Sequence, residues 1–323
     1  MTRTTPQIKK FSKIYQVILV MVLIFGFLPV SAYQTEIISD GGIQNDFVVS
    51  PGKIEVFIDA GNQKSVTLSV ANRTGRDGRF ILSTEDFTGS DDPNLAVVLQ
   101  GELESSSSLK NFIYFPEEEF TLKHNERALI PITITVPGGT EAGGRFASVF
   151  VSFIPAYDES SGPNVSSEAR VVARIGSLIF ATVNGETFHD GRLLSFQTKN
   201  KKSLFGENKI PMQITFENNS TTHLNPYGLV TIRNVFGTKV GEVVIDPWFV
   251  LPDSVRLRDF VFSKENLFGM YSATLEMNRG YDDQIDESKI NFFVLPIKET
   301  SALVLVLIAL VVLVLVKNKK KNE

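Results

Sequence analysis

The strongest constraint on the fold of this chain is an alternation of apolar and polar residues that recurs along its middle. Apolar side chains take every second position in the segments 66–70, 130–136, 147–153 and 212–216. Successive side chains of a β-strand point to opposite faces, so this period of two predicts half-buried strands. Turn-forming runs such as Asn72–Gly75 and Pro137–Gly139 separate them. No helical stripe longer than two turns lies between the two ends, so we expect an all-β protein.

The strands fall into two blocks. We expect an immunoglobulin-like β-sandwich over 44–186 and a second immunoglobulin-like sandwich over 187–297, because each holds several short strands separated by turn signals. Pro131 lacks an amide donor, so its strand should be an edge or carry a bulge there. Tyr271 stands near the start of a late strand, where such folds place a tyrosine that hydrogen-bonds back to the main chain. The polar segment 86–110 is expected to be a long excursion between strands.

Composition limits the partners. The chain has no cysteine, so a disulfide framework or a thiolate zinc site is excluded and stability must come from core burial. Between residues 33 and 299 there are 24 lysines and arginines against 35 acids, a net charge of about −11. Nucleic-acid binding depends on lysine and arginine, so no nucleic-acid partner is expected.

Both ends of the sequence are apolar. A basic start, an apolar core from Val17 and the small residues before the end of segment 1–32 predict a secretory signal peptide cut after Ala32. The uncharged run Ala302–Val316 predicts a single transmembrane helix over 300–317, and the lysines of the tail 318–323 predict a cytoplasmic C-terminus. The expected membrane anchor includes Leu303, Val304, Leu310, Val316 and Lys317. These patterns indicate a single-pass plasma-membrane protein whose large domain lies outside.

Enzyme chemistry finds little support in the sequence. His124, His189 and His223 are far apart, and none has a metal-ligand partner at a suitable spacing. No G-x-S-x-G nucleophile motif occurs. We therefore expect no catalytic residue, no cofactor and no metal, and hence no enzyme. The acidic segment Asp282–Glu287 is interpreted as an ordinary loop, with Ca²⁺ binding left open.

A cluster of aromatic residues supplies the candidate contact surface. Phe112, Tyr114 and Phe115 surround Pro116 close to the end of the 86–110 excursion. Exposed aromatic side chains near loops often bind glycans or peptides. The alternative is that each ring belongs to the sandwich core.

Four stretches of the sequence form a recognisable set: Val49–Gly52, Gly61–Asn72, Ile132–Pro137 with Ala142–Gly144, and Arg174–Gly185. In these stretches the chain resembles WxL-interacting proteins, a family of two-domain surface proteins of Gram-positive bacteria. The resemblance implies a peptidoglycan-binding first domain, an immunoglobulin-like second domain and a membrane anchor with a lysine-rich tail. The chain departs from sortase substrates, because 295–299 lacks the threonine and glycine of that signal.

These observations predict a membrane-anchored binding or adhesion protein. Its expected partner is a cell-wall glycan or another surface protein. The alternative is a pilus-chaperone-like or scaffold protein that acts by β-strand complementation.

Overall fold

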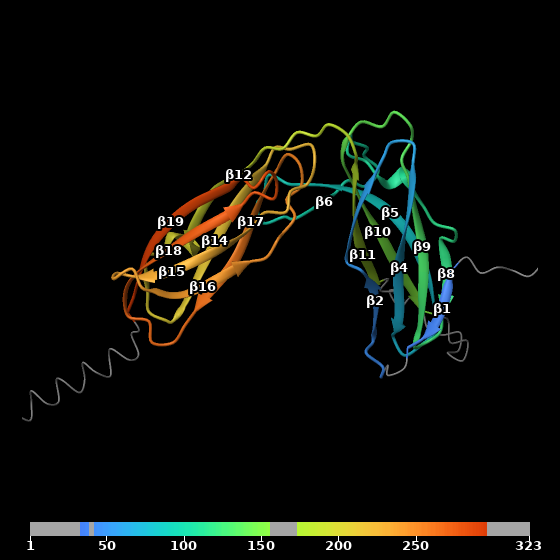
Figure 1. The fold of residues 1–323 in the computed structure, drawn as a ribbon. Helices are drawn as coiled ribbons and strands as arrows, with labels where there is room; N and C mark the ends of the chain where they lie inside the picture. The colour runs from blue at the N-terminus through green and yellow to red at the C-terminus, as the bar shows by residue number, and fades with distance from the viewer. Residues whose placement is uncertain (1–32, 39–41, 156–172, 296–323) are drawn as a thin grey trace, which may run out of the picture.

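The fold is all-β, as the alternation predicts, and consists of two β-sandwiches (Figure 1). The computed structural model describes residues 33–38, 42–155 and 173–295. Within these residues the helical elements are two single 3₁₀ turns, η1 (Lys110–Phe112) and η2 (Lys199–Lys201). The expected signal peptide over 1–32, the expected membrane helix over 300–317 and the tail 318–323 lie outside the described residues.

Domain 1 packs two sheets against each other. Sheet A contains β1 (Gln34–Ile37), β9 (Glu126–Thr135), β4 (Gln63–Arg73) and β2 (Asp46–Ser50) in that order, with β7 (Ile113–Tyr114) also beside β9. Sheet B contains β3 (Lys53–Ile58), β11 (Ala173–Val183), β10 (Gly143–Pro155) and β5 (Gly78–Thr88), with β6 (Val98–Leu99) and β8 (Glu119–Leu122) both beside β5.

The chain crosses from sheet A to sheet B between β2 and β3. β2 pairs antiparallel with β4 over its whole length, up to Ser50. The Ser50–Pro51 peptide bond is cis, and after Gly52 the chain continues as β3, parallel to β11. The crossing places β3 at the border of sheet B, where it pairs with β11 over 178–183 only.

Domain 2 is a smaller sandwich. Its three-stranded sheet has the order β12 (Gly191–Thr198), β14 (Lys209–Asn218) and β17 (Ser254–Ser263). Its five-stranded sheet has the order β13 (Leu204–Phe205), β19 (Ile285–Val294), β18 (Gly269–Asn278), β15 (Tyr227–Asn234) and β16 (Lys239–Ile245). Each domain has its own buried core, and the alternating residues supply it: Leu68 and Ile132 in domain 1, Ile214 and Leu275 in domain 2.

Two sequence features find their structural reason in the strand pairing. Pro131 lies in β9, whose outer neighbour β1 covers 126–129 and whose other outer neighbour β7 covers 133–134. Pro131 therefore faces the gap between β1 and β7, and its pairing with β4 continues without a bulge. Tyr271 forms the expected corner: its hydroxyl accepts a hydrogen bond from Phe268 N at 3.0 Å and donates to Phe268 O at 3.2 Å.

The two domains share one buried asparagine motif. Asn72 at the end of β4 donates through Nδ2 to the carbonyls of Arg76 and Leu122 at 2.9 and 3.1 Å. Asn218 at the end of β14 donates in the same way to the carbonyls of Thr222 and Val250 at 2.9 and 2.8 Å. Each asparagine Oδ1 also accepts the amide two residues later. Such side chains satisfy buried main-chain carbonyls where the strand ends, so the same solution closes both sandwiches.

Asp86 closes the excursion between β5 and β7. This carboxylate is buried and accepts hydrogen bonds from the amides of Leu109 and Lys110 at 2.9 and 2.8 Å and from the Ser108 hydroxyl. The segment thus leaves sheet B at Asp86 and returns to the same side chain. Within it, β6 pairs with Phe87 and Thr88 of β5.

Replacing Asp86 should release this excursion. Asp86→Ala leaves two main-chain amides without their acceptor, and we expect the free energy of unfolding to fall by about 2–4 kcal/mol. Asp86→Asn keeps one acceptor oxygen and should cost about half as much. Urea unfolding monitored by fluorescence measures the loss, and limited proteolysis should cut the excursion faster. Glu102→Ala, an exposed acid in the same segment, is the control. Equal stabilities of Asp86→Ala and Glu102→Ala would refute this role.

Candidate functional site: the cleft between the two domains

A row of aromatic side chains crosses the outer face of sheet B. The register places Glu55 of β3, Phe180 of β11 and Phe146 of β10 side by side, and Phe87 of β5 continues the row. The ring centroids of Phe146 and Phe180, and of Phe87 and Phe180, are each 5.5 Å apart, edge to face. All three rings are buried although they point away from the core of domain 1.

Domain 2 supplies the cover for this row. Leu251 is buried against the three rings, and Phe249 packs on Phe180 with centroids 5.0 Å apart. The Arg256 guanidinium stacks 4.0 Å above the Phe249 ring, while Lys53 Nζ lies 5.6 Å from the Phe180 ring. Apolar burial shared by two domains joins them, because separating the domains would expose these rings to water.

Main-chain hydrogen bonds between the two domains also hold this contact in place. The excursion of domain 1 runs along the border of β17, where Ser90 O accepts from Val255 N at 3.1 Å and Pro93 O accepts from Leu257 N at 2.8 Å. Gly89 permits the approach, since a Cβ there would lie 2.3 Å from Cβ of Ser254. The segment 86–110, predicted as a long excursion between strands, is therefore partly occupied by a contact with domain 2 (Figure 1).

A histidine from domain 2 is buried against the row. The His223 ring packs on Phe180 with centroids 4.9 Å apart, and its Nε2 lies 3.4 Å from Glu55 Oε1. Glu55 also accepts a hydrogen bond from Lys53 Nζ at 2.7 Å. His223 Nδ1 is buried, with no hydrogen-bond partner among the described residues.

The charges around His223 work against each other. Burial lowers the pKa of His223, Glu55 opposes the shift and Lys53 adds to it. Burial acts to raise the pKa of Glu55, but the hydrogen bond from Lys53 and the nearby His223 hold it below its ordinary value. Burial and Lys53 therefore favour the neutral form of the imidazole, whereas the Glu55 carboxylate favours the charged form.

The cleft beside His223 contains a cavity of about 350 Å³. Both domains line it: Glu55 and Phe57 come from β3, while His223, Asn225 and Tyr281 come from domain 2. His189, the residue at the domain junction, also lines it and lies 5.4 Å from the Tyr281 ring. The lining combines carboxylate, amide, hydroxyl and aromatic groups, which suits a polar ligand or a peptide main chain.

One wall of this cavity is an open strand border. Leu178 N donates to Gly52 O, and Asn184 N donates to Ile58 O, so the groups of even-numbered residues 52–58 point toward β11. In a parallel pair the intervening residues point the other way. The main-chain groups of Lys53, Glu55 and Phe57 therefore face outward, and no described strand pairs with them. The first residues of β11, before Ser177, likewise have no described strand beside them on the side of β3.

The predicted aromatic surface lies elsewhere. Phe112 and Phe115 are half-buried and pack on the core of domain 1, whereas Tyr114 is 64 % exposed on β7 beside sheet A. The structure therefore does not gather the three rings into one exposed platform. The cleft residues escaped the sequence analysis because they come from distant segments. One signal was available: charged and aromatic residues at 53, 55 and 57 alternate with apolar residues directly after Pro51–Gly52.

Within the acidic segment Asp282–Glu287, the Asp286 carboxylate is engaged by neighbouring donors. Arg279 donates two hydrogen bonds to Asp286, at 3.0 and 2.6 Å, and Leu193 N donates a third at 3.0 Å. Across the part of the chain that the structure describes, no group of three potential metal ligands comes together. None of the described helices is long and apolar enough to cross a membrane.

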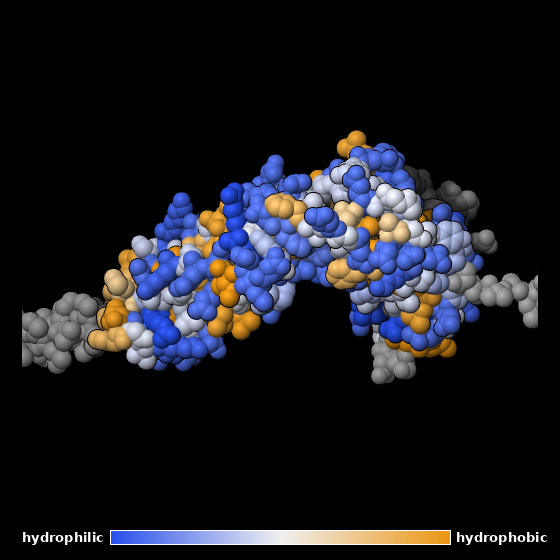
Figure 2. Space-filling view, turned by 45° about the horizontal axis from the view of Figure 1, so that its top comes forward, coloured by the Kyte–Doolittle hydropathy of each residue, from blue (hydrophilic) through white to orange (hydrophobic). Residues whose placement is uncertain are grey.

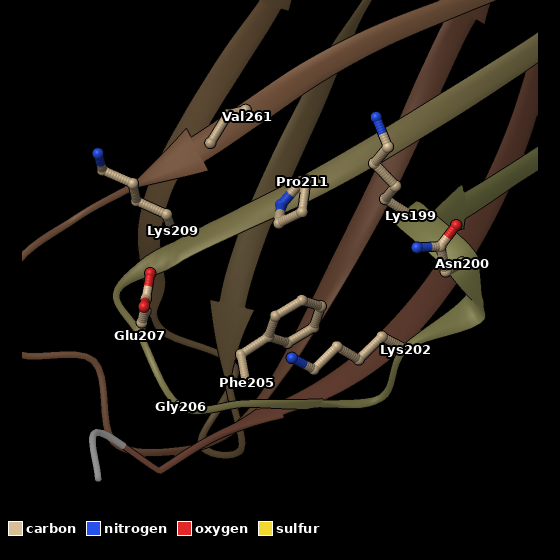
Figure 3. A pocket seen from close by; sticks show the side chains of 9 residues that line it. All are labelled: Lys199, Asn200, Lys202, Phe205, Gly206, Glu207, Lys209, Pro211 and Val261. Atoms are coloured by element: carbon tan, nitrogen blue, oxygen red, sulfur yellow. The ribbon is translucent and has the colours of Figure 1, made fainter. Parts of the chain in front are cut away.

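A second hollow lies at the far end of domain 2. It measures about 800 Å³ and is lined by Lys199, Lys202 and Lys209 around Phe205, Pro211 and Val261 (Figure 3). Glu207 is the acid among its lining residues. This hollow is open and basic, whereas the interdomain cavity is a mixed polar pocket.

Comparison with known proteins gives no family. No protein-family model matches the sequence, and no curated protein matches it. Among solved structures, the class 5 fimbriae chaperone CfaA is 11 % identical with a TM-score of 0.39, covering 77 % of this chain and 100 % of its own. The CupB2 chaperone of Pseudomonas aeruginosa is 11 % identical with a TM-score of 0.34, covering 76 % and 100 %. A PapD-like domain of human CEP192 is 11 % identical with a TM-score of 0.31, covering 46 % and 92 %. At such low scores these likenesses carry no conclusion about function.

Truncating Phe180 should loosen the two domains. Phe180→Ala removes the ring that touches Phe87, Phe146, Phe249 and His223, and should cost about 3–5 kcal/mol. We expect calorimetry to resolve two unfolding transitions and small-angle scattering to show a larger radius of gyration. Ile179→Ala, in the core of domain 1, is the matched control and should lower stability without separating the domains. An unchanged radius for Phe180→Ala would contradict the assigned role.

The buried histidine should make stability depend on pH. The His223 pKa is lowered in the fold, so between that value and about 6.5 the unfolded state binds more protons. The free energy of unfolding should therefore rise with pH over this window. The stability that depends on a neutral His223 is lost as pH falls below about 6.5. Thermal unfolding of the wild type and His223→Gln across pH tests this. The difference between the two free energies of unfolding should change with pH only within this window and stay constant on either side of it, and parallel pH profiles would refute the assignment.

Proposed function

We propose that this chain is a non-enzymatic binding protein that takes up an extended segment of another surface protein along the open border of β3. The observation that carries the proposal is the outward-facing main chain of Lys53, Glu55 and Phe57, next to a cavity that both domains line. An added strand would hydrogen-bond to these groups. Its alternate side chains would point toward the cavity. This is the β-strand complementation of the chaperone-like alternative.

A signal peptide over 1–32 and a membrane helix over 300–317 complete the proposal. They place both domains outside the cell and tether them to the plasma membrane, since the apolar run 302–316 is followed by lysines. Tethering raises the effective concentration of the binding cleft near surface partners.

A cell-wall glycan is the second candidate partner. The cavity presents Thr187, Asn184 and Asn225 together with the exposed ring of Phe57. Amides, hydroxyls and an aromatic face also suit sugar rings. The strand border favours the peptide, because a glycan makes no use of a row of outward-facing amides and carbonyls. Of these groups, the Phe57 carbonyl accepts a long hydrogen bond from Lys64 Nζ at 3.4 Å.

A pair of substitutions at Phe57 separates strand pairing from side-chain contact. Phe57→Ala keeps the outward amide, whereas Phe57→Pro removes it without breaking a hydrogen bond to β11. The probe is a soluble ten-residue peptide of alternating valine and threonine with lysine ends, added to the full chain in detergent. We expect Phe57→Pro to bind about tenfold more weakly than Phe57→Ala by calorimetry.

Hydrogen exchange locates the contact in the same samples. Wild-type residues 53–58 should gain protection when the peptide binds. Binding without protection there, or equal affinities for the two variants, would rule out strand complementation at β3. Protection of this segment by insoluble peptidoglycan but not by the peptide would favour the glycan.

A further inference from the structure

The end of domain 2 that lies farthest from domain 1 exposes a row of apolar side chains. The register places Leu204 beside Phe293 and Phe293 beside Met270 on three adjacent strands of the five-stranded sheet. Their neighbours Phe205, Phe292 and Tyr271 point into the core, so this row points out. Figure 2 shows apolar residues gathered at this end of domain 2.

Two braced turns extend the row. Phe236 is 87 % exposed at the tip of the β15–β16 hairpin, where Asn234 Oδ1 accepts from the amides of Phe236 and Thr238, each at 3.0 Å. Phe268 is 64 % exposed on the turn that the Tyr271 hydroxyl closes. Both rings are held outward by side-chain hydrogen bonds within the turn. Monomeric proteins seldom expose large apolar groups contiguously unless they bind something.

The same end carries lysines. Lys199, Lys202 and Lys209 surround the open hollow of Figure 3, and their chain segments adjoin β13, which holds Leu204. Lys202 and Lys209 form no ion pair among the described residues. This basic character contrasts with the acidic total of the chain. Apolar rings beside lysines match the interfacial region of an anionic bilayer, where rings enter the acyl boundary and amines meet phosphates.

The chain itself brings a bilayer to this end. β19 ends at Val294, and the described residues end at Leu295. Only residues 296–301 separate Leu295 from the apolar run that begins at Ala302. Six extended residues span at most about 20 Å. If the run 302–316 crosses a membrane, the row cannot stand far from the surface of that membrane.

We propose that the row of Leu204, Phe293 and Met270, together with Phe236 and Phe268, is a lipid-contacting surface that rests on the outer leaflet of the bilayer. The inference depends on the membrane helix of the proposed function and goes beyond it. A flexible tether alone would leave the domains free to tumble. Contact at this end would instead fix the orientation of domain 2 relative to the bilayer and hold the cleft and domain 1 at a distance from the membrane (Figure 1).

Fluorescence quenching by brominated lipid tests the contact. The full chain is reconstituted in vesicles of phosphatidylcholine and phosphatidylglycerol, with or without bromine near the carbonyl end of the acyl chains. The natural tryptophan, Trp248, is buried in domain 2, and its wild-type signal is subtracted. We expect the emission of Phe236→Trp and of Phe268→Trp to fall about twofold in brominated vesicles, because interfacial side chains reach about 5–10 Å into the boundary.

Phe188→Trp is the matched control. Phe188 is 60 % exposed and precedes β12 at the opposite end of domain 2, so its emission should not change. Flotation of the vesicles reports the anchor separately. Flotation with no quenching at 236 and 268 overturns the lipid contact alone, and so does equal quenching at 188. Failure to float overturns the membrane helix and this contact with it. Crosslinking of Phe236→Cys between chains without quenching would assign the row to a second copy instead.

Discussion

The burial of Phe87, Phe146 and Phe180 on the outer face of sheet B is the interaction on which the two-domain arrangement depends. These rings belong to the core of neither sandwich, and they leave water only when Leu251 and Phe249 of domain 2 cover them. Full burial of an aromatic side chain is worth about 2–3 kcal/mol, so the row favours docking far more than any exposed ion pair could. Gly144 makes room for this packing, because a Cβ there would collide with the ring of Phe146.

The docking creates the cleft and sets its chemistry. Glu55 continues the aromatic row onto β3, and there it meets His223 from domain 2. Because the imidazole is desolvated by the same rings that join the domains, its protonation and the closeness of the domains are linked. The outward main chain of β3 forms the open side of this junction. An incoming strand would therefore contact a border whose position relative to domain 2 is already set.

The two proposed contacts divide the molecule. Strand binding uses the border of domain 1 at the interdomain cleft, and lipid contact uses the opposite end of domain 2. Domain 2 would then act as a spacer of defined orientation between the membrane and the cleft. The acidic character of the chain as a whole and the lysines of the distal end are consistent with this division, since only the end facing phosphates gains from being basic.

Local pattern in the sequence was enough to establish the all-β class, many core positions and the corner at Tyr271. Alternation at 66–70 and 130–136 decides which face of a strand is buried, because side-chain direction has a period of two. The tertiary structure alone decided the site. Glu55, Phe180 and His223 meet through pairings between strands distant in sequence, and no local spacing encodes a contact between two domains. Phe112 and Phe115 show how a local pattern can mislead. Their aromatic rings near a loop suggested an exposed contact surface, but both pack against the core of domain 1 and are half-buried. The sequence by itself determined what each strand could bury, and the tertiary structure determined which strand border stayed open.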